Sequence, residues 1–387
     1  MPMPMRMSQA APMLFGPGAL GALGDQLKML GCSNPIIVTD KGVTAAGATA
    51  KVEKAIKDAG LACSIYDGCL SDAPTDSITV AADAIRAAKA DAIVALGGGS
   101  SLDTAKAASL ILKDPKPITE FIGKPPGVPD VPIITIPTTS GTGSEVTIVG
   151  VLSISETSKK TGVVITGASV AIIDPELTVG VPPSITAATG MDVVAHCVEA
   201  ITGKMRNPMS DIRGYESLRL VAAHLQAAVA DGTNITARSG MSLASSLAGL
   251  AFSDSITTLG HAIAQALASV FHLHHGLLCG LATPPQLELF ATVVPERVRK
   301  IAEIFGADIP YDATPEEIGM IAGDKMREFM ASVGLQSFAD LGYTEKDLTD
   351  QTDVLMQEGM KDFSPCDIPR DVAEKVLGRM FAYKSGK

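Results

Sequence analysis

The chain has 387 residues, of which 46% are hydrophobic, and it carries a net charge of −11 with a pI near 5.0. This length suggests two domains, each with a sizeable apolar core. The apolar runs are broken before the roughly 18 residues that a membrane span requires. Basic residues do not cluster in the sequence, which argues against a nucleic-acid partner. We therefore expect a cytoplasmic protein that binds neither membranes nor nucleic acids.

Between residues 30 and 180, short apolar segments alternate with helical patterns. The predicted strands are 35–40, 61–66, 91–96, 132–137, 163–165 and 170–173, and the helical patterns between them cover 43–59, 75–90 and 102–112. Such alternation is typical of a mostly parallel sheet with helices on both faces. We predict an α/β domain over residues 1–183.

The pattern changes after residue 183, where Ala/Leu-rich amphipathic stretches replace the strands. We predict helices at 185–203, 209–230, 236–252, 258–270, 277–290, 294–305, 315–333 and 367–382. Their apolar residues recur at the helical period. We therefore predict an all-helical domain over residues 184–387.

Three glycines, Gly97, Gly98 and Gly99, follow a predicted strand, and with Ser100 they precede the next helical pattern. Glycines at this position let a backbone approach a pyrophosphate, and the amides at a helix start favour the anion. The loop is not a GxGxxG fingerprint, and a tight structural turn is the alternative interpretation. Its place at a strand end favours a dinucleotide site.

Two further strand ends carry polar side chains. One is followed by a loop whose hydroxyls come from Thr138, Thr139, Thr142 and Ser144, and we expect these to contact the cofactor. The other ends at Asp40, which suits a ribose diol and would repel a 2′-phosphate, so NAD is favoured over NADP. Alternatively, Asp40 only caps the next helix.

All six histidines lie between residues 190 and 276. Asp192 and His196 are four residues apart and share one face of a helix. With His261 and His275 they form a set of three imidazoles and one carboxylate, which suits Fe²⁺ or Zn²⁺ and leaves coordination positions open. The six cysteines contain no CxxC pair, and we interpret them as reduced thiols that serve as small apolar residues.

Taken together, these motifs resemble the iron-containing, or group III, alcohol dehydrogenases, which share an architecture with dehydroquinate synthase. The matching segments, in order, are 15–18, 38–40, 97–100, 137–145, 190–196, 207–208, 249–252, 260–261 and 275–276.

The resemblance implies a metal- and NAD(H)-dependent enzyme that interconverts primary alcohols or polyols and the matching carbonyl compounds. We expect the substrate to be a small primary alcohol or a short polar aldehyde. The resemblance implies an active site between the two domains and a homodimer or larger homo-oligomer. It also adds Lys160 to the cofactor-binding residues and places Ser144, Thr147, Val149 and Phe252 at the substrate pocket.

The chain departs from the family pattern near its metal ligands. Many relatives carry a proton-relaying histidine where this chain has Gln265, and glutamine does not titrate. His272 and His274 are therefore candidates, with His261 and Gln265, for the catalytic machinery. The alternative is that His272 and His274 are exposed loop or helix-end residues.

Two other activities remain as alternatives. One is a polyol or glycerol-phosphate dehydrogenase. The other is a lyase similar to dehydroquinate synthase, which needs several basic residues to hold a phosphorylated acidic substrate. Residues 190–280 offer few basic side chains and no evident phosphate clamp, so the alcohol dehydrogenase interpretation is favoured.

Overall fold

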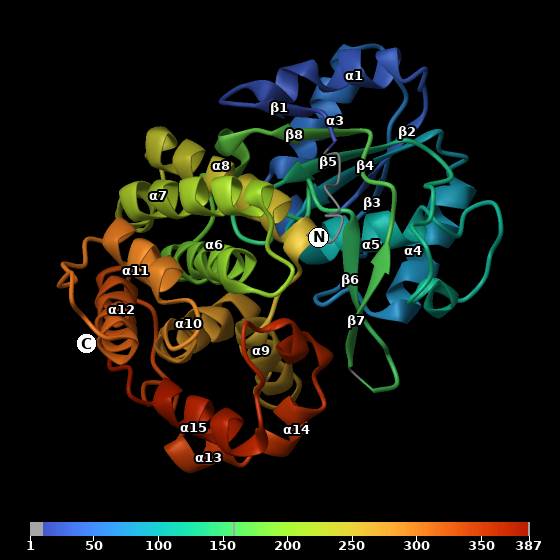
Figure 1. Ribbon diagram of the computed structural model, residues 1–387. Coiled ribbons are helices and arrows are strands. Elements are labelled where there is room, and N and C mark those ends of the chain that lie inside the picture. The colour runs from blue at the N-terminus through green and yellow to red at the C-terminus, as the bar shows by residue number, and fades with distance from the viewer. Residues whose placement is uncertain (1–10, 158, 386–387) are drawn as a thin grey trace. The chain divides into compact units, whose positions relative to one another are not determined.

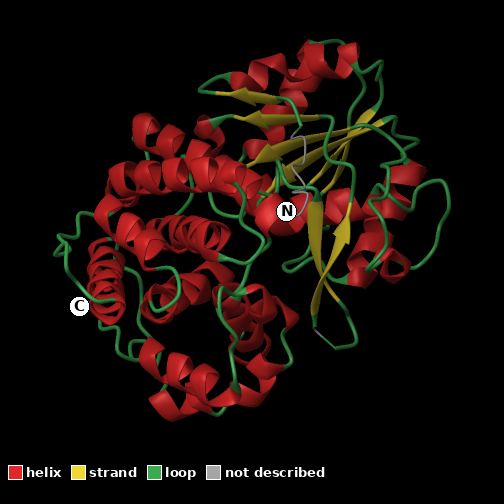
Figure 2. Ribbon diagram, in the orientation of Figure 1, coloured by secondary structure: helices red, strands yellow, loops and turns green. Residues whose placement is uncertain are grey.

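A computed structural model of the protein describes residues 11–157 and 159–385 (Figure 1). The chain forms two compact units, one ending at Val181 and the other beginning at Pro182. Within the described residues, all strands belong to the first unit, whereas the second consists of helices and loops (Figure 2). The predicted combination of an α/β unit and an all-helical unit is confirmed.

The first unit is built on a six-stranded sheet in which every pair of neighbouring strands is parallel. Successive residues such as Ile36 and Ile37 enter different apolar clusters, because side chains alternate between the faces of a strand. Both faces are therefore buried. In spatial order the strands are β1 (Met13–Phe15), β8 (Val170–Ile173), β5 (Ile133–Pro137), β4 (Ala92–Gly97), β2 (Pro35–Val38) and β3 (Ser64–Tyr66).

The strand order reverses beside β2. The chain runs from β2 to the edge strand β3 and then returns to place β4 on the other side of β2. Ligands of open α/β sheets bind at such a reversal, outside the carboxyl ends of the strands. The helices of this unit are α1 (Leu23–Met29), α2 (Lys41–Ala45), α3 (Ala48–Asp58), α4 (Thr75–Ala87) and α5 (Gly99–Ala108).

This unit differs from the sequence prediction in the edge strand β1, which was not predicted, and in a separate hairpin. Strands β6 (Val149–Ser153) and β7 (Lys160–Val164) pair antiparallel as a separate hairpin. The sequence predicted only a short strand at 163–165 and missed β6. Each strand of the pair contains a glycine, Gly150 and Gly162, which interrupts the apolar alternation that marks a strand.

The second unit surrounds one buried helix, α6 (Pro183–Thr202), in which every residue from Thr186 to Thr202 is buried. A helix that is buried on all sides belongs to the core of its unit. Two short helices, α13 (Glu345–Thr349) and α14 (Thr352–Met356), were not predicted. None of the described helices combines the length and apolarity that crossing a membrane requires. The others are α7 (Pro208–Ala230), α8 (Ile235–Ser255), α9 (Leu259–Phe271), α10 (His275–Ala291), α11 (Pro295–Ile304), α12 (Pro315–Ser332) and α15 (Arg370–Met380).

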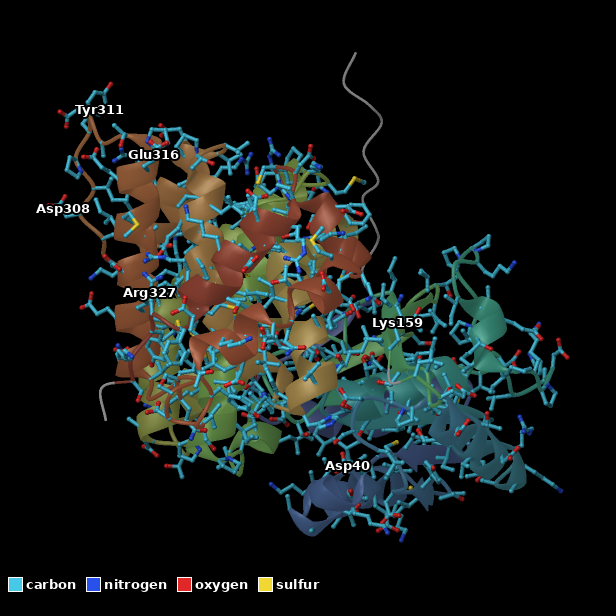
Figure 3. All side chains as sticks on the ribbon, turned by 90° about the horizontal axis from the view of Figure 1, so that it is seen from below. Asp40, Lys159, Asp308, Tyr311, Glu316 and Arg327 are labelled. Atoms are coloured by element: carbon cyan, nitrogen blue, oxygen red, sulfur yellow. The ribbon has the colours of Figure 1, made fainter. Side chains whose placement is uncertain are left out.

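A largely buried carboxylate ties α10 to its neighbours. Glu288 Oε1 accepts from Arg327 Nη2 at 2.6 Å, and Glu288 Oε2 accepts from Arg379 Nε at 2.9 Å. Arg327, labelled in Figure 3, belongs to α12, and Arg379 belongs to α15. Charge-assisted pairs of this kind fix the direction of the helices that carry them, so the far end of α10 is held by ion pairs.

Two glycines let the start of α10 lie against α6. A Cβ at Gly276 would lie 2.4 Å from the carbonyl oxygen of Ala188, and one at Gly280 would lie 2.8 Å from Cβ of Met191. Gly276 and Gly280 are four residues apart and therefore share one helix face. The absence of side chains on this face allows the close approach of α10 to α6.

The substitution Gly276→Ala tests this contact. Because the added methyl would meet backbone rather than a mobile side chain, we expect a loss of about 1–3 kcal/mol in the free energy of unfolding. For a chain of this size that corresponds to roughly 1–4 °C in Tm. Scanning calorimetry measures the change. Gly359→Ala is the matched control, since a Cβ there meets nothing within 4 Å; equal Tm values for the two variants would contradict the prediction.

Candidate functional site

Helix α6 presents three polar side chains to the interior of the second unit. Asp192, His196 and Glu199 follow one another at intervals of four and three residues, so they lie along one face of the helix. All three are buried, with exposed fractions of 2%, 5% and 0%. Buried ionisable groups need partners, and the neighbouring helices provide them.

Two of those partners are imidazoles at helix starts. His261 lies in the first turn of α9, and His275 is the first residue of α10. Oδ1 of Asp192 lies 3.8 Å from Nε2 of His261, 3.9 Å from Nε2 of His275 and 4.0 Å from Nδ1 of His196. These distances are too long for hydrogen bonds. The structure thus brings the four predicted metal ligands together around one carboxylate oxygen.

The arrangement fits a metal ion in two respects. Donor atoms at about 2.0–2.2 Å from a tetrahedral ion lie roughly 3.3–3.6 Å from one another, only slightly closer than the spacing observed here. Among the described residues, Oδ1 of Asp192 has no hydrogen-bond partner although it is buried. A buried oxygen in that condition is costly unless a cation completes its surroundings.

The electrostatics keep Asp192 ionised. Burial by itself would raise its pKa, but His196, His275 and His261, together with a hydrogen bond from Cys279, lower the pKa to about 2. A carboxyl group must be deprotonated to bind a metal. The pocket therefore holds this side chain in the form that a divalent ion requires.

Cys279 is a neighbour that the sequence interpretation treated as a small apolar residue. Its Sγ lies 3.5 Å from Nε2 of His275. The donor atoms of Asp192, His261, His275 and Cys279 lie within 4.8 Å of one another. The imidazole of His196 lies outside this group of donors and stacks on Phe252, with ring centroids 4.2 Å apart and an angle of 15°. One wall of the cluster is therefore aromatic.

Glu199 was missed by the sequence analysis. Its Oε1 lies 2.9 Å from Nδ1 of His261, and both of its oxygens accept backbone N–H groups at the start of α9. The signal was present, because Glu199 is a lone carboxylate inside the apolar run 193–201, three residues after His196. Its full burial could not be read from one helix alone.

The three other predicted catalytic positions lie in different surroundings. Gln265 is half-buried, and its Nε2 lies 3.9 Å from the sulfur of Met360. His272 and His274 are exposed. His272 ends α9 in a left-handed conformation with φ of 53°, and His274 is the N-cap of α10. These two histidines therefore lie at the turn that leads into His275.

In the first unit, the predicted cofactor residues gather where β2 and β4 end. Asp40, labelled in Figure 3, follows β2, and Gly97 ends β4 with φ of 144°. A Cβ at Gly97 would lie 3.3 Å from Oδ2 of Asp40, and one at Gly98 would lie 3.4 Å from Oγ1 of Thr139. A Cβ at Gly99 would meet Thr142 at 2.8 Å. The glycine loop is thus enclosed by the side chains predicted to act with it.

Asp40 is anchored by two hydrogen bonds. Val43 N donates to Oδ1 at 3.0 Å, which makes Asp40 the N-cap of α2, and the hydroxyl of Ser101 donates to Oδ2 at 2.8 Å. Helix capping was the alternative interpretation of this residue. The capping bond occupies one position on Oδ1 and leaves its second lone pair, so capping is compatible with a contact to a ribose.

A buried lysine lies beneath the second polar loop, and the sequence analysis missed it. Lys106 is fully buried, and its Nζ donates to Ser144 Oγ at 2.7 Å, Thr147 Oγ1 at 3.0 Å and the carbonyl of Val149 at 2.9 Å. Burial lowers its pKa, an effect opposed by Asp103 at 3.4 Å. The predicted pocket residues Ser144, Thr147 and Val149 are thus held by one ammonium group.

The remaining predicted cofactor residues are also held by polar contacts. Lys160 forms an ion pair with Asp72 at 2.7 Å. The amide of Thr138 donates to the carbonyl of Gly97 at 3.0 Å, which joins the two polar loops. The backbone N–H of Asp72 donates to Oγ of Ser100 at 3.0 Å. Loop 138–142, Ser100 and Lys160 are therefore linked to the same glycine loop.

Comparison with known proteins identifies relatives that span most of the chain. Choline dehydrogenase of Bacillus subtilis is 32% identical over 95% of this chain and 91% of the relative. Sulfoacetaldehyde reductase of Bilophila wadsworthia is 36% identical over 76% of this chain and 77% of the relative. The crystal structure of sulfoacetaldehyde reductase from Bifidobacterium kashiwanohense in complex with NAD⁺ has a TM-score of 0.88 and 30% identity, covering 99% of this chain and 100% of that one.

Two family models match consecutive parts of the sequence. Residues 10–175 match the model described as iron-containing alcohol dehydrogenase, and residues 186–381 match the model of the C-terminal part of the same family. The matches include the glycine loop of the first unit and the histidine cluster of the second. The protein is an oxidoreductase that belongs to the iron-containing alcohol dehydrogenase family.

Proposed function

We propose that the protein transfers hydride between NAD(H) and a short primary alcohol or polar aldehyde, with a divalent metal in the second unit. The observation that carries this proposal is the convergence of three imidazole nitrogens within 4.0 Å of one buried carboxylate oxygen. Neutral imidazoles and a carboxylate match the ligand preferences of Fe²⁺ and Zn²⁺.

We infer that Asp192, His196, His261 and His275 hold the metal. Fe²⁺ is the first candidate, as the family description suggests, and Zn²⁺ is the alternative. Such an ion would supply Lewis acidity toward the oxygen of the substrate. The chain's own contribution is to keep the Asp192 carboxyl ionised and to exclude water by burial.

We infer that the glycine loop and Asp40 bind NAD(H). A helix, α5, starts within the loop at Gly99, so its amides and dipole favour a pyrophosphate. Asp40 keeps an acceptor position for a ribose hydroxyl and places a negative charge where NADP would carry its phosphate. The relative from Bifidobacterium kashiwanohense, whose structure contains NAD⁺, supports this choice. The nicotinamide would supply the hydride chemistry.

A short polar aldehyde is the substrate class that we propose. It is supported by the relatives named for choline and sulfoacetaldehyde, which are 32% and 36% identical to this chain. Phe252 offers an apolar surface beside His196, and His272 and His274 are candidates to bind a polar group of the substrate. Gln265 can hold a hydrogen bond but cannot relay a proton by titration. We further propose a cytoplasmic homodimer or larger homo-oligomer, on the strength of the family resemblance.

The substitution His261→Ala tests the metal site. We expect loss of bound metal and of NADH-linked aldehyde reduction, because one of the converging donors is removed. Elemental analysis of the purified variant and a spectrophotometric assay measure the two effects. Gln265→Ala is the comparison, and we expect it to keep its metal and to lose far less activity. Full metal content and full turnover in His261→Ala would contradict the proposal.

The substitution Asp40→Asn tests the choice of nucleotide. The amide keeps an oxygen that can cap α2 but removes the negative charge. We expect the preference for NAD⁺ over NADP⁺, measured as the ratio of kcat/KM values, to fall by roughly tenfold, equivalent to about 1.4 kcal/mol. Asp58→Asn, which removes an exposed carboxylate at the end of α3, is the control. An unchanged ratio in Asp40→Asn would assign Asp40 to helix capping alone.

A further inference from the structure

We propose that Glu199 is a positioning residue that sets the tautomer and the direction of the His261 ring toward the metal. This inference rests on the proposed function, since it concerns a predicted metal ligand. Glu199 does not belong to the group of converging donors described above. Its carboxylate lies on the opposite side of the His261 ring from Asp192, because it contacts Nδ1 whereas Asp192 faces Nε2.

The hydrogen bonds of Glu199 define its role. Oε1 accepts from the backbone N–H of His261 at 3.1 Å, and Oε2 accepts from the backbone N–H of Thr258. A peptide N–H can only donate, so both carboxylate oxygens act as acceptors. Oε1 also lies 2.9 Å from Nδ1 of His261. Two acceptors cannot share a hydrogen bond, and Nδ1 must therefore carry the proton.

The position of that proton decides what the other ring nitrogen can do. A neutral imidazole that is protonated at Nδ1 has a lone pair at Nε2. Nε2 of His261 is the atom that lies 3.8 Å from Oδ1 of Asp192, among the converging donors. Carboxylates that accept from the far nitrogen of a ligating histidine fix its tautomer and raise its basicity. Glu199 thus prepares His261 to donate to a metal.

Gly260 makes this contact possible. A Cβ at position 260 would lie 2.5 Å from Oε1 of Glu199 and 2.4 Å from Oε1 of Gln286. Only glycine leaves room for the carboxylate beside the start of α9, where the helix dipole also favours a negative charge. The same side chain therefore caps α9 and orients His261, so the position of the ligand depends on the position of the helix start relative to α6.

Metal binding by Glu199→Gln is the first test. The amide group of glutamine donates at one of the two oxygen positions, so it cannot accept from both backbone N–H groups and still accept from Nδ1. We expect metal-stripped Glu199→Gln to bind Co²⁺ roughly 10–100-fold more weakly than the unchanged chain, measured by absorption titration. Thr202→Val is the matched control: this buried residue of the same helix bonds only to the carbonyl of Val198 in α6 among the contacts described.

The tautomer itself is the second test, and it needs no variant of Glu199. Histidine-selective ¹⁵N labelling of the metal-stripped chain, at about pH 8 where an ordinary imidazole is neutral, reports which nitrogen carries the proton. The signals of His261 are assigned by their loss in His261→Ala. We expect a protonated Nδ1 and an unprotonated Nε2. A proton on Nε2, or Co²⁺ affinity in Glu199→Gln equal to that of the unchanged chain, would overturn the proposal.

The two tests separate this inference from the proposed function. If the unchanged chain binds Co²⁺ no better than His261→Ala does, the metal site itself is wrong, whatever the tautomer. If the unchanged chain binds Co²⁺ through His261 while Glu199→Gln keeps full affinity, the metal site stands and the role of Glu199 is wrong. Should Glu199→Gln fail to fold, the tautomer of the unchanged chain decides.

Discussion

A single buried carboxylate oxygen, Oδ1 of Asp192, is the feature on which the helical unit depends. Taking an ionised carboxylate out of water costs several kcal/mol unless other charges or hydrogen bonds replace the lost hydration. Three imidazoles surround this oxygen at 3.8–4.0 Å, which is close enough to lower the pKa of Asp192 to about 2 but too far for hydrogen bonding. The surrounding imidazoles therefore favour the ionised carboxylate, but they do not form hydrogen bonds with its Oδ1 atom. A small cation bound between these groups would supply the missing interaction.

The donor side chains converge because the starts of α9 and α10 lie very close to α6. His261 and His275 each stand next to a glycine, and in both cases a methyl group would collide with α6 or with a side chain that belongs to it. At Gly276 the obstacle is the carbonyl of Ala188, and at Gly260 it is the carboxylate of Glu199. The glycine beside each histidine therefore has a steric reason. A donor at the start of a helix reaches the buried helix α6 here only because the neighbouring residue has no side chain.

Sequence reasoning predicts what depends on local periodicity and misses what depends on packing. Asp192 and His196 share a face because they are one helical turn apart, and the glycine loop was found because it follows an apolar strand. Glu199 and Lys106 were not predicted as site residues, because a charged residue in a helix normally faces water. Their burial depends on elements that are distant in the sequence. The β6 strand was missed for a related reason, since its pairing with β7 and not its own pattern defines it. Short C-terminal helices such as α14 offer too few turns for a period to emerge.

Each unit contains a buried charge, Lys106 in the first and Asp192 in the second. The two charges differ in the hydrogen bonds that they form within the fold, and this difference indicates their roles. Lys106 has four oxygen partners within 3.4 Å, and one of them is a carboxylate, so its charge and its three donors are accounted for inside the fold. Such a group stiffens the loop that it holds and has no need of a ligand. Asp192, by contrast, faces nitrogens that can themselves serve as ligands. A satisfied buried charge organises structure, whereas one whose oxygen lacks a hydrogen bond among the described residues marks the place where a ligand completes it.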